Sequence, residues 1–153
     1  MTKQEAIDKA IAYFKEGYAC SQSVAMTFAP EFGADLNTIT MISAPFGGGM
    51  GRLRGKCGAV TGGFMVLGMA TGRYNPKDMD TKLAQYKKVQ DLNAAIVNIY
   101  STAECGELLK KKVSKEQVDA RAHHNIVCTG IIADTVDALY DILYANSDGK
   151  PLE

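Results

Sequence analysis

Apolar and polar positions recur with a helical period from the first residues of the chain onward. In residues 2–16 the apolar side chains are spaced three or four positions apart, as on one face of an α-helix. Thr2 belongs to the residue types that cap the start of a helix, and Gly17 to those that end one. The pattern therefore predicts a first helix between Thr2 and Gly17, with one apolar face: Ala6, Ile7, Ala10, Ile11 and Phe14.

The same periodicity and its interruptions predict helices through the rest of the chain. Pro30 and Pro45 end the second and third helices, because a proline ring disfavours helical backbone at the preceding residue. Pro76 suits the first turn of a long fifth helix. Ser114 with Gln117 forms a capping-box pattern. The helices after the first are expected to begin near Cys20, Asn37, Cys57, Pro76, Cys105, Ser114 and Cys128.

No segment alternates as a half-buried strand would, so the predicted fold class is all-α. We expect one domain over residues 1–153, a compact bundle of about five to seven helices, with residues 146–153 frayed. Residues 57–72 carry no charge and are shorter than the roughly 20 residues of a membrane span, which predicts a central buried helix. Its small residues at helical spacing, such as Gly58 with Gly62 and Gly68 with Gly72, predict that other helices approach closely.

Charge and the N-terminal pattern narrow the range of functions. Seventeen basic residues balance seventeen acidic ones, which argues against a nucleic-acid partner or an anionic membrane surface. The first residues carry helix-forming charges where a signal peptide would have a basic start and an apolar stretch. We expect a cytoplasmic protein with no membrane insertion, whose apolar faces permit a homodimer.

Four cysteines are the main candidates for chemistry. In a reducing compartment they are thiols, metal ligands or a reversible redox pair, and their spacing matches no zinc ribbon or ferredoxin. Each lies at, or within a residue or two of, a predicted helix start, where free N–H groups lower the pKa of a thiol. The four are Cys20, Cys57, Cys105 and Cys128.

The glycine-rich stretch over residues 47–63 surrounds the second of these cysteines. It fails the pattern of a P-loop, because Met50 stands at the first glycine position and Cys57 at the hydroxyl position. Arg52 and Arg54 likewise occupy positions that the dinucleotide fingerprint reserves for glycine. We expect the bare backbone to bring Cys57 close to other chain segments, with a cofactor or an anionic ligand contacted by Arg54, Gly55, Lys56 and Gly58.

The hexapeptide at residues 57–62, CGAVTG, resembles the signature of a family of redox-active proteins named for the cysteine pattern C, GCAxxG, C, C. The other three cysteines fall in that family's order, and the resemblance covers about residues 10–139. It implies redox or metal-cluster chemistry at a shared site, with the four cysteines as catalytic residues and metal ligands. The family is similar to a domain of split-Soret cytochromes c, but this chain has no CxxCH for covalent haem.

Several forms of that chemistry remain open. Four soft thiolates suit an iron–sulfur cluster, which would exchange electrons with an unknown redox partner, or a zinc ion. A metal-free site could use Cys57 as the attacking thiolate, with Cys20 or Cys128 as the resolving thiol. His123 and His124 could replace a cysteine as ligands, although a surface and a helix-end role are the commoner ones. A different class of function is a non-catalytic helical binding module with structural cysteines or structural zinc.

Overall fold

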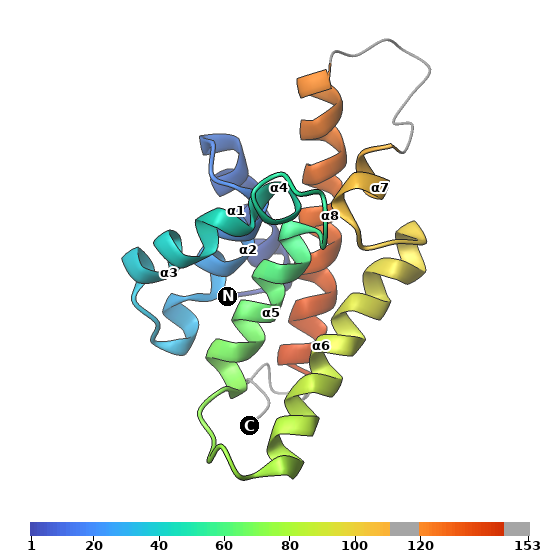
Figure 1. Cartoon of the computed structure of the whole chain (residues 1–153). Helices are drawn as coiled ribbons and strands as arrows, with labels where there is room; N and C mark the ends of the chain where they lie inside the picture. Colours follow the sequence, from blue (N-terminus) through green and yellow to red (C-terminus); the bar gives the residue numbers. More distant parts are fainter. Residues whose placement is uncertain (111–119, 146–153) are drawn as a thin grey trace.

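The computed structural model of the chain describes residues 1–110 and 120–145, which form α-helices joined by short connections (Figure 1). Helix α7 is a single turn, α4 is a four-residue turn with left-handed backbone at Gly48, Gly49 and Met50, and 3-10 turns follow α2 and α3. In these ranges the backbone forms no strand, and the six longer helices confirm the predicted all-α bundle. The elements are α1 Lys3–Glu16, α2 Cys20–Phe28, α3 Leu36–Ser43, α4 Gly47–Met50, α5 Gly58–Thr71, α6 Met79–Tyr100, α7 Cys105–Leu109 and α8 Ala120–Leu143.

The start of α1 follows directly from its sequence. The Thr2 hydroxyl accepts a hydrogen bond from the Glu5 N–H at 3.1 Å, and the Glu5 carboxylate accepts one from the Thr2 N–H at 2.8 Å. This reciprocal pair satisfies two N–H groups that a helix start leaves free. Gly17 closes the helix in a left-handed conformation with φ 109°. The predicted bounds of α1 are confirmed.

Two predicted helix starts are wrong. Helix α6 begins at Met79, after Pro76, because the Asp78 carboxylate accepts a hydrogen bond from the Thr81 N–H and caps the helix there. Helix α8 begins at Ala120, so Cys128 lies inside it and not at its start. Residues 120–127 contain no glycine or proline that would stop the helix before Cys128. The predicted capped turn at Ser114 and the predicted frayed end, residues 146–153, lie outside the described residues.

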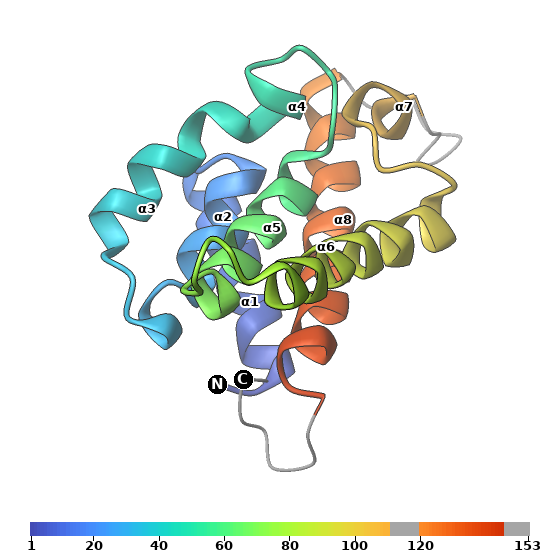
Figure 2. The same cartoon turned by 60° about the horizontal axis from the view of Figure 1, so that its bottom comes forward.

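Helix α5 occupies the centre of the bundle, in contact with α2, α6 and α8 (Figure 2). Its first half is buried, as predicted, and Val60, Val66 and Leu67 are fully inaccessible, whereas residues 68–71 are half-buried. A Cβ atom at Gly62 would lie 2.6 Å from the Ser21 carbonyl oxygen, so the two backbones touch. A Cβ at Gly68 would meet nothing within 4 Å. The predicted close approach is therefore correct for the first half of α5 and wrong at Gly68.

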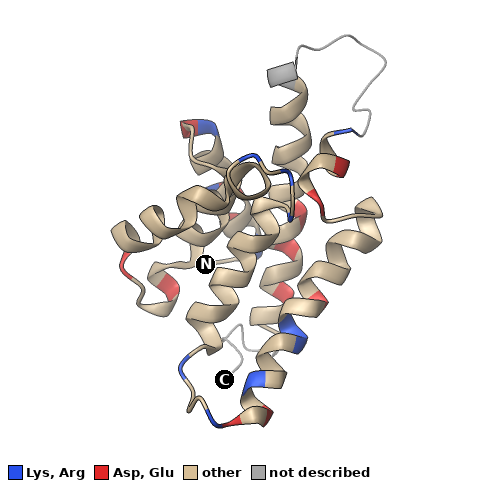
Figure 3. Ribbon diagram, viewed as in Figure 1, with Lys and Arg blue, Asp and Glu red and all other residues tan. Residues whose placement is uncertain are grey.

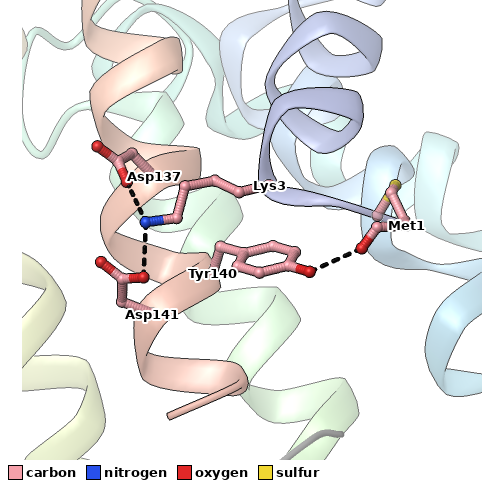
Figure 4. A network of polar contacts seen from close by, with 5 residues as sticks. All are labelled: Met1, Lys3, Asp137, Tyr140 and Asp141. Carbon is pink, nitrogen blue, oxygen red and sulfur yellow. Dashed lines mark hydrogen bonds and ion pairs between the residues drawn. The ribbon is translucent and has the colours of Figure 1, made fainter. Parts of the chain in front are cut away.

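Helix α8 is fastened to the first residues of the chain near its C-terminal end (Figure 4). The Lys3 ammonium lies 2.6 Å from the carboxylates of both Asp137 and Asp141, and the Tyr140 hydroxyl donates to the Met1 carbonyl oxygen at 2.7 Å. All these polar groups are partly exposed, so each ion pair contributes little to stability. Within the described ranges, none of the helices has the length and apolarity that crossing a membrane demands.

Candidate functional site

The glycine-rich stretch folds into a left-handed turn over residues 48–52. Every residue of this turn has a positive φ, between 59° and 69°, and the Gly51 N–H donates to the Gly47 carbonyl oxygen at 2.9 Å. Left-handed backbone costs an L-amino acid about 1–2 kcal/mol per residue. Met50 and Arg52 carry that cost in the turn, and Arg54 carries it just beyond, with φ 61°. Such strain persists only where the surrounding structure imposes it.

The glycines of this turn let its backbone touch the neighbouring cysteine segments. A Cβ atom at Gly49 would lie 2.6 Å from the Cβ of Cys105, and one at Gly47 would lie 2.5 Å from the Cβ of Ala19, the residue before Cys20. Any larger residue at either position would push these segments apart. The left-handed turn therefore holds the starts of α2 and α7 against one loop.

Two backbone segments bring Cys57 and Cys105 side by side. The Cys57 N–H donates to the Ala103 carbonyl oxygen at 2.8 Å, and the Cys105 N–H donates to the Gly55 carbonyl oxygen at 2.7 Å. These bonds flank an isolated antiparallel bridge between Lys56 and Glu104. The ladder fixes two cysteines that lie far apart in the sequence.

The other two cysteines approach from α2 and α8. A Cβ atom at Gly58 would lie 2.3 Å from the Cys20 sulfur, so this thiol packs directly against the first residue of α5. The charges of the other three thiols all raise the pKa of the Cys128 thiol, which places the four sulfur atoms within electrostatic reach of one another. All four are free thiols; Cys57 and Cys105 are buried and the other two are half-buried. We call these four residues the thiol cluster.

Burial determines the protonation of these thiols. It raises the pKa of Cys20 and Cys128, and it raises that of Cys57 to about 12. The lowering of the thiol pKa that the helix starts predict is therefore wrong in its net direction for Cys20 and Cys57. Hydrogen bonds from the N–H groups of Gly48 and Ser21 do lower the pKa of Cys20, but the loss of hydration outweighs them.

The predicted cofactor-binding residues divide into two groups. The Arg54 guanidinium donates to the Cys105 sulfur at 3.5 Å, while Gly55 and Gly58 contact Cys105 and Cys20 as described above. Lys56 lies in other contacts, at 3.3 Å from the Glu104 carboxylate and 2.8 Å from the Asn93 side-chain oxygen. Arg54, and not Lys56, is the cation next to a thiol.

Residues outside the predicted cofactor set also adjoin the thiol cluster. Burial is the largest cause that lowers the pKa of His124, and the charges of Arg54 and Arg52 lower it further. This imidazole therefore lies beside the loop that carries the two arginines. His123 instead contacts the Leu109 carbonyl oxygen at 2.8 Å through its Nε2. His124 precedes Cys128 by four residues on α8, a spacing that places both on one helix face. The predicted helix that begins at Cys128 leaves His124 outside it, so the sequence prediction misses this shared face.

Tyr100, at the end of α6, is a neighbour that no sequence pattern indicated. Its hydroxyl donates to the Asp134 carboxylate of α8. Burial and this carboxylate raise the pKa of Tyr100, and the charge of Cys57 adds to the effect. A polar pair therefore lies within electrostatic reach of the buried side of the cluster.

The four cysteines are residues of the kind that bind metals, but their side chains are not arranged around one metal ion. Among residues 1–110 and 120–145, no three or more His, Cys, Asp or Glu side chains are arranged to hold a metal ion. Four sulfur atoms, from α2, the N-cap of α5, α7 and α8, nevertheless lie within electrostatic reach of one another, with backbone N–H groups directed at Cys20 and Cys57.

Comparison with known proteins identifies the chain through its family. No curated protein and no solved structure matches it. Residues 18–142 match the family described as "Putative redox-active protein (C_GCAxxG_C_C)". The match takes in all four cysteines and most of the 153 residues, so the chain belongs to this family.

Proposed function

We propose that the thiol cluster is a single redox centre that carries electrons by holding an iron–sulfur cluster. The observation that carries this proposal is the convergence of four thiols from four separate segments at the strained left-handed turn. Backbone strain of this kind concentrates at functional sites. The family description, as redox-active, points to the same chemistry.

The surroundings of the sulfur atoms suit such a group. Cys20, Cys57, Cys105 and Cys128 would supply the thiolates, and the bound cluster would accept and release an electron. N–H groups of Gly48, Ala59 and Val60 face the sulfur atoms of Cys20 and Cys57, and Arg54 faces Cys105. Hydrogen bonds to sulfur and local charge set the reduction potential of such centres. The burial of Cys57 and Cys105 keeps water away.

The family description as redox-active favours a cluster over a lone zinc ion, because zinc has no redox chemistry. Four thiolates around one zinc must all lie about 2.3 Å from the same point, and the described side chains form no group ready to hold a metal ion of either kind. In a cluster the thiolates bind different iron atoms, so their sulfur atoms stay further apart. Metal binding would still have to displace the thiol protons, whose loss burial opposes, and turn the side chains toward one another.

Anaerobic purification followed by iron, sulfide and zinc analysis tests the proposal. We expect iron and acid-labile sulfide, charge-transfer absorption and an EPR signal in one oxidation state. Replacing any one of the four cysteines by serine should remove most of the iron, whereas Ala29→Ser, a buried change at the opposite end of α2 from Cys20, should not. Stoichiometric zinc with no iron would overturn the proposal, as would unchanged iron in all four variants.

A second candidate is a metal-free disulfide between Cys20 and Cys57. Burial has the largest effect on the pKa of Cys57, and the charge of Cys20 has the second largest, so the two sulfur atoms are near each other. Cys20 is also partly exposed. The two thiols would lose two electrons and two protons to a disulfide substrate, which is reduced to two thiols. Because the thiolate is the attacking form and burial opposes it, this exchange should speed up as pH rises.

Mass spectrometry of the peptides after treatment with oxidised glutathione tests the second candidate. A Cys20–Cys57 cross-link in iron-free protein would support it. An unchanged count of four thiols, together with the absence of iron, would overturn both redox proposals and favour the non-catalytic binding module.

A further inference from the structure

Two arginines and a histidine gather beside the thiol cluster, at the end of the molecule where the loop after α4 meets α8. The basic positions of this loop stand out in Figure 3. A Cβ atom at Gly48 would lie 3.0 Å from the Cγ of Arg52 and 3.8 Å from the Nη1 of Arg54, so both arginine side chains pass over the same glycine. Their charges also act on His124. We call Arg52, Arg54 and His124 the basic rim.

The arginine charges of the basic rim are not balanced by an ion pair within residues 1–110 and 120–145. In the part of the chain that the structure describes, neither arginine forms an ion pair, whereas Lys56 of the same loop is matched by Glu104. Within those same residues, the Arg54 guanidinium donates to the Cys105 sulfur, and the Arg52 side chain has no hydrogen bond. Like charges held together without an anion destabilise a protein, and their backbones at φ 64° and 61° add strain. A bound anion would offset the repulsion between the two guanidinium groups.

Access to the thiols limits the size of that anion. Cys57 and Cys105 are only 6% and 7% exposed, so no macromolecule can reach them. Cys128 is half-buried and lies one helical turn from His124. Guanidinium groups bind carboxylate and phosphate groups through pairs of parallel hydrogen bonds. His124, whose pKa is lowered, is neutral at pH 7 and can donate one further hydrogen bond.

We propose that the basic rim binds a small oxyanion group, and that the redox substrate carries this group toward Cys128 and Cys105. The word substrate rests on the proposed redox function; the anion site itself does not. The oxyanion can be free, such as a sulfur or phosphorus oxyanion, or the charged end of a larger organic molecule.

NMR titration of the reduced, metal-free protein tests the site without using its redox activity. Sulfate, inorganic phosphate and phenyl phosphate are added at constant ionic strength, with chloride as the reference anion, while the His124 ring resonance is followed. We expect saturable shifts with each oxyanion and a rise in the pKa of His124, because a bound negative charge favours the imidazolium. A lower Kd for phenyl phosphate than for phosphate would assign the oxyanion to an organic molecule, and the reverse order to a free oxyanion.

Matched variants locate the binding. Arg52→Gln and Arg54→Gln should each weaken oxyanion binding about tenfold, as expected for loss of one charged hydrogen-bond donor. Arg73→Gln, an exposed arginine just after α5, removes the same charge and should leave the Kd unchanged. Shifts that do not saturate, that chloride reproduces, or that persist in Arg52→Gln and Arg54→Gln would overturn the inference. Because the titration uses metal-free protein, its outcome does not bear on the iron–sulfur proposal, which the metal analysis of anaerobically purified protein tests separately.

Discussion

The Cys57 sulfur shows how one residue balances opposing effects. It sits at the N-cap of α5, where the N–H groups of Ala59 and Val60 favour its thiolate. It is also 6% exposed, and the charges of Cys20 and Cys105 oppose its ionisation. Loss of hydration is the larger effect, so the thiol of the metal-free protein stays protonated well above pH 9.

This protonation predicts a loss of stability in alkaline solution. Above pH 9.0 the thiol of Cys57 ionises in the unfolded chain, whereas in the folded chain its pKa is about 12. Between these values the folded state binds more protons, so the free energy of unfolding should fall by up to about 1.4 kcal/mol per pH unit for this thiol. Urea unfolding of the reduced, metal-free protein between pH 8 and 10 measures the slope.

The Cys57→Ala variant separates this effect from general alkaline denaturation. It removes the titrating group, so its free energy of unfolding should depend less steeply on pH, whatever its absolute value. Equal slopes for the variant and the natural chain would show that the buried thiol does not ionise differently in the two states.

At the scale of the elements, the left-handed turn over residues 48–52 carries backbone strain at two residues that are not glycine. Met50 and Arg52 adopt a conformation that glycine adopts freely, and both side chains are exposed. Between Arg52 and Arg54, Leu53 is 83% exposed and its φ is not positive. Leu53, the residue directly after the turn, is therefore a matched control position.

Replacing Met50 by glycine should stabilise the protein. Relief of the left-handed strain is worth about 1 kcal/mol, less the extra entropy of glycine in the unfolded chain. Leu53→Gly brings that entropic cost without relieving any strain, so it should destabilise by about 0.5–1 kcal/mol. Chemical unfolding of the two variants gives the comparison, and destabilisation by both would mean that Met50 is not strained.

Helix α5 offers a second matched pair. A Cβ at Gly62 would lie 2.6 Å from the Ser21 carbonyl oxygen, which is backbone and cannot move aside cheaply, whereas a Cβ at Gly68 meets nothing within 4 Å. We expect Gly62→Ala to destabilise by about 1–3 kcal/mol and Gly68→Ala to stabilise by about 0.5–1 kcal/mol. Thermal unfolding followed by circular dichroism measures both, and equal effects would contradict the packing described for α5.

The elements also show what sequence can predict. Thr2, Gly17 and Pro30 mark helix ends through local backbone preferences. The ends of α1 and α2 therefore agree with the sequence prediction within a residue or two. The start of α8 was missed because residues 120–127 contain no local stop signal. The left-handed turn was not predicted, since Met50 and Arg52 disfavour it and only contacts with distant Cys105 and Ala19 impose it. Thiol pKa values depend on burial by those same distant contacts.

At the scale of the molecule, the thiol cluster and the ion pairs between α8 and the start of the chain lie toward opposite ends of α8. Lys3 with Asp137 and Asp141 fastens its C-terminal end, whereas Cys128 and His124 stand in its N-terminal half. The left-handed turn lies at the same end as Cys128, together with two arginines that form no ion pair with any described residue. The packing around α5 holds this end together in the metal-free state, and a ligand of the thiols would add favourable contacts there.

Ligand binding by the cluster should therefore stabilise the whole fold. The cysteines span residues 20–128, so only a chain folded from α2 to α8 brings all four together. A group that binds the folded state at 100 times its Kd adds about 2.7 kcal/mol to the free energy of unfolding, or roughly 5–10 °C in Tm for a chain of this size. Calorimetry of protein loaded anaerobically with iron and sulfide, against the same protein treated with a chelator, measures the shift. Cys128→Ser should lose most of it and Ala29→Ser should keep it, because only the former removes a thiol from the cluster. Equal Tm values for loaded and chelated protein would mean that iron binds outside the fold that gathers the four thiols.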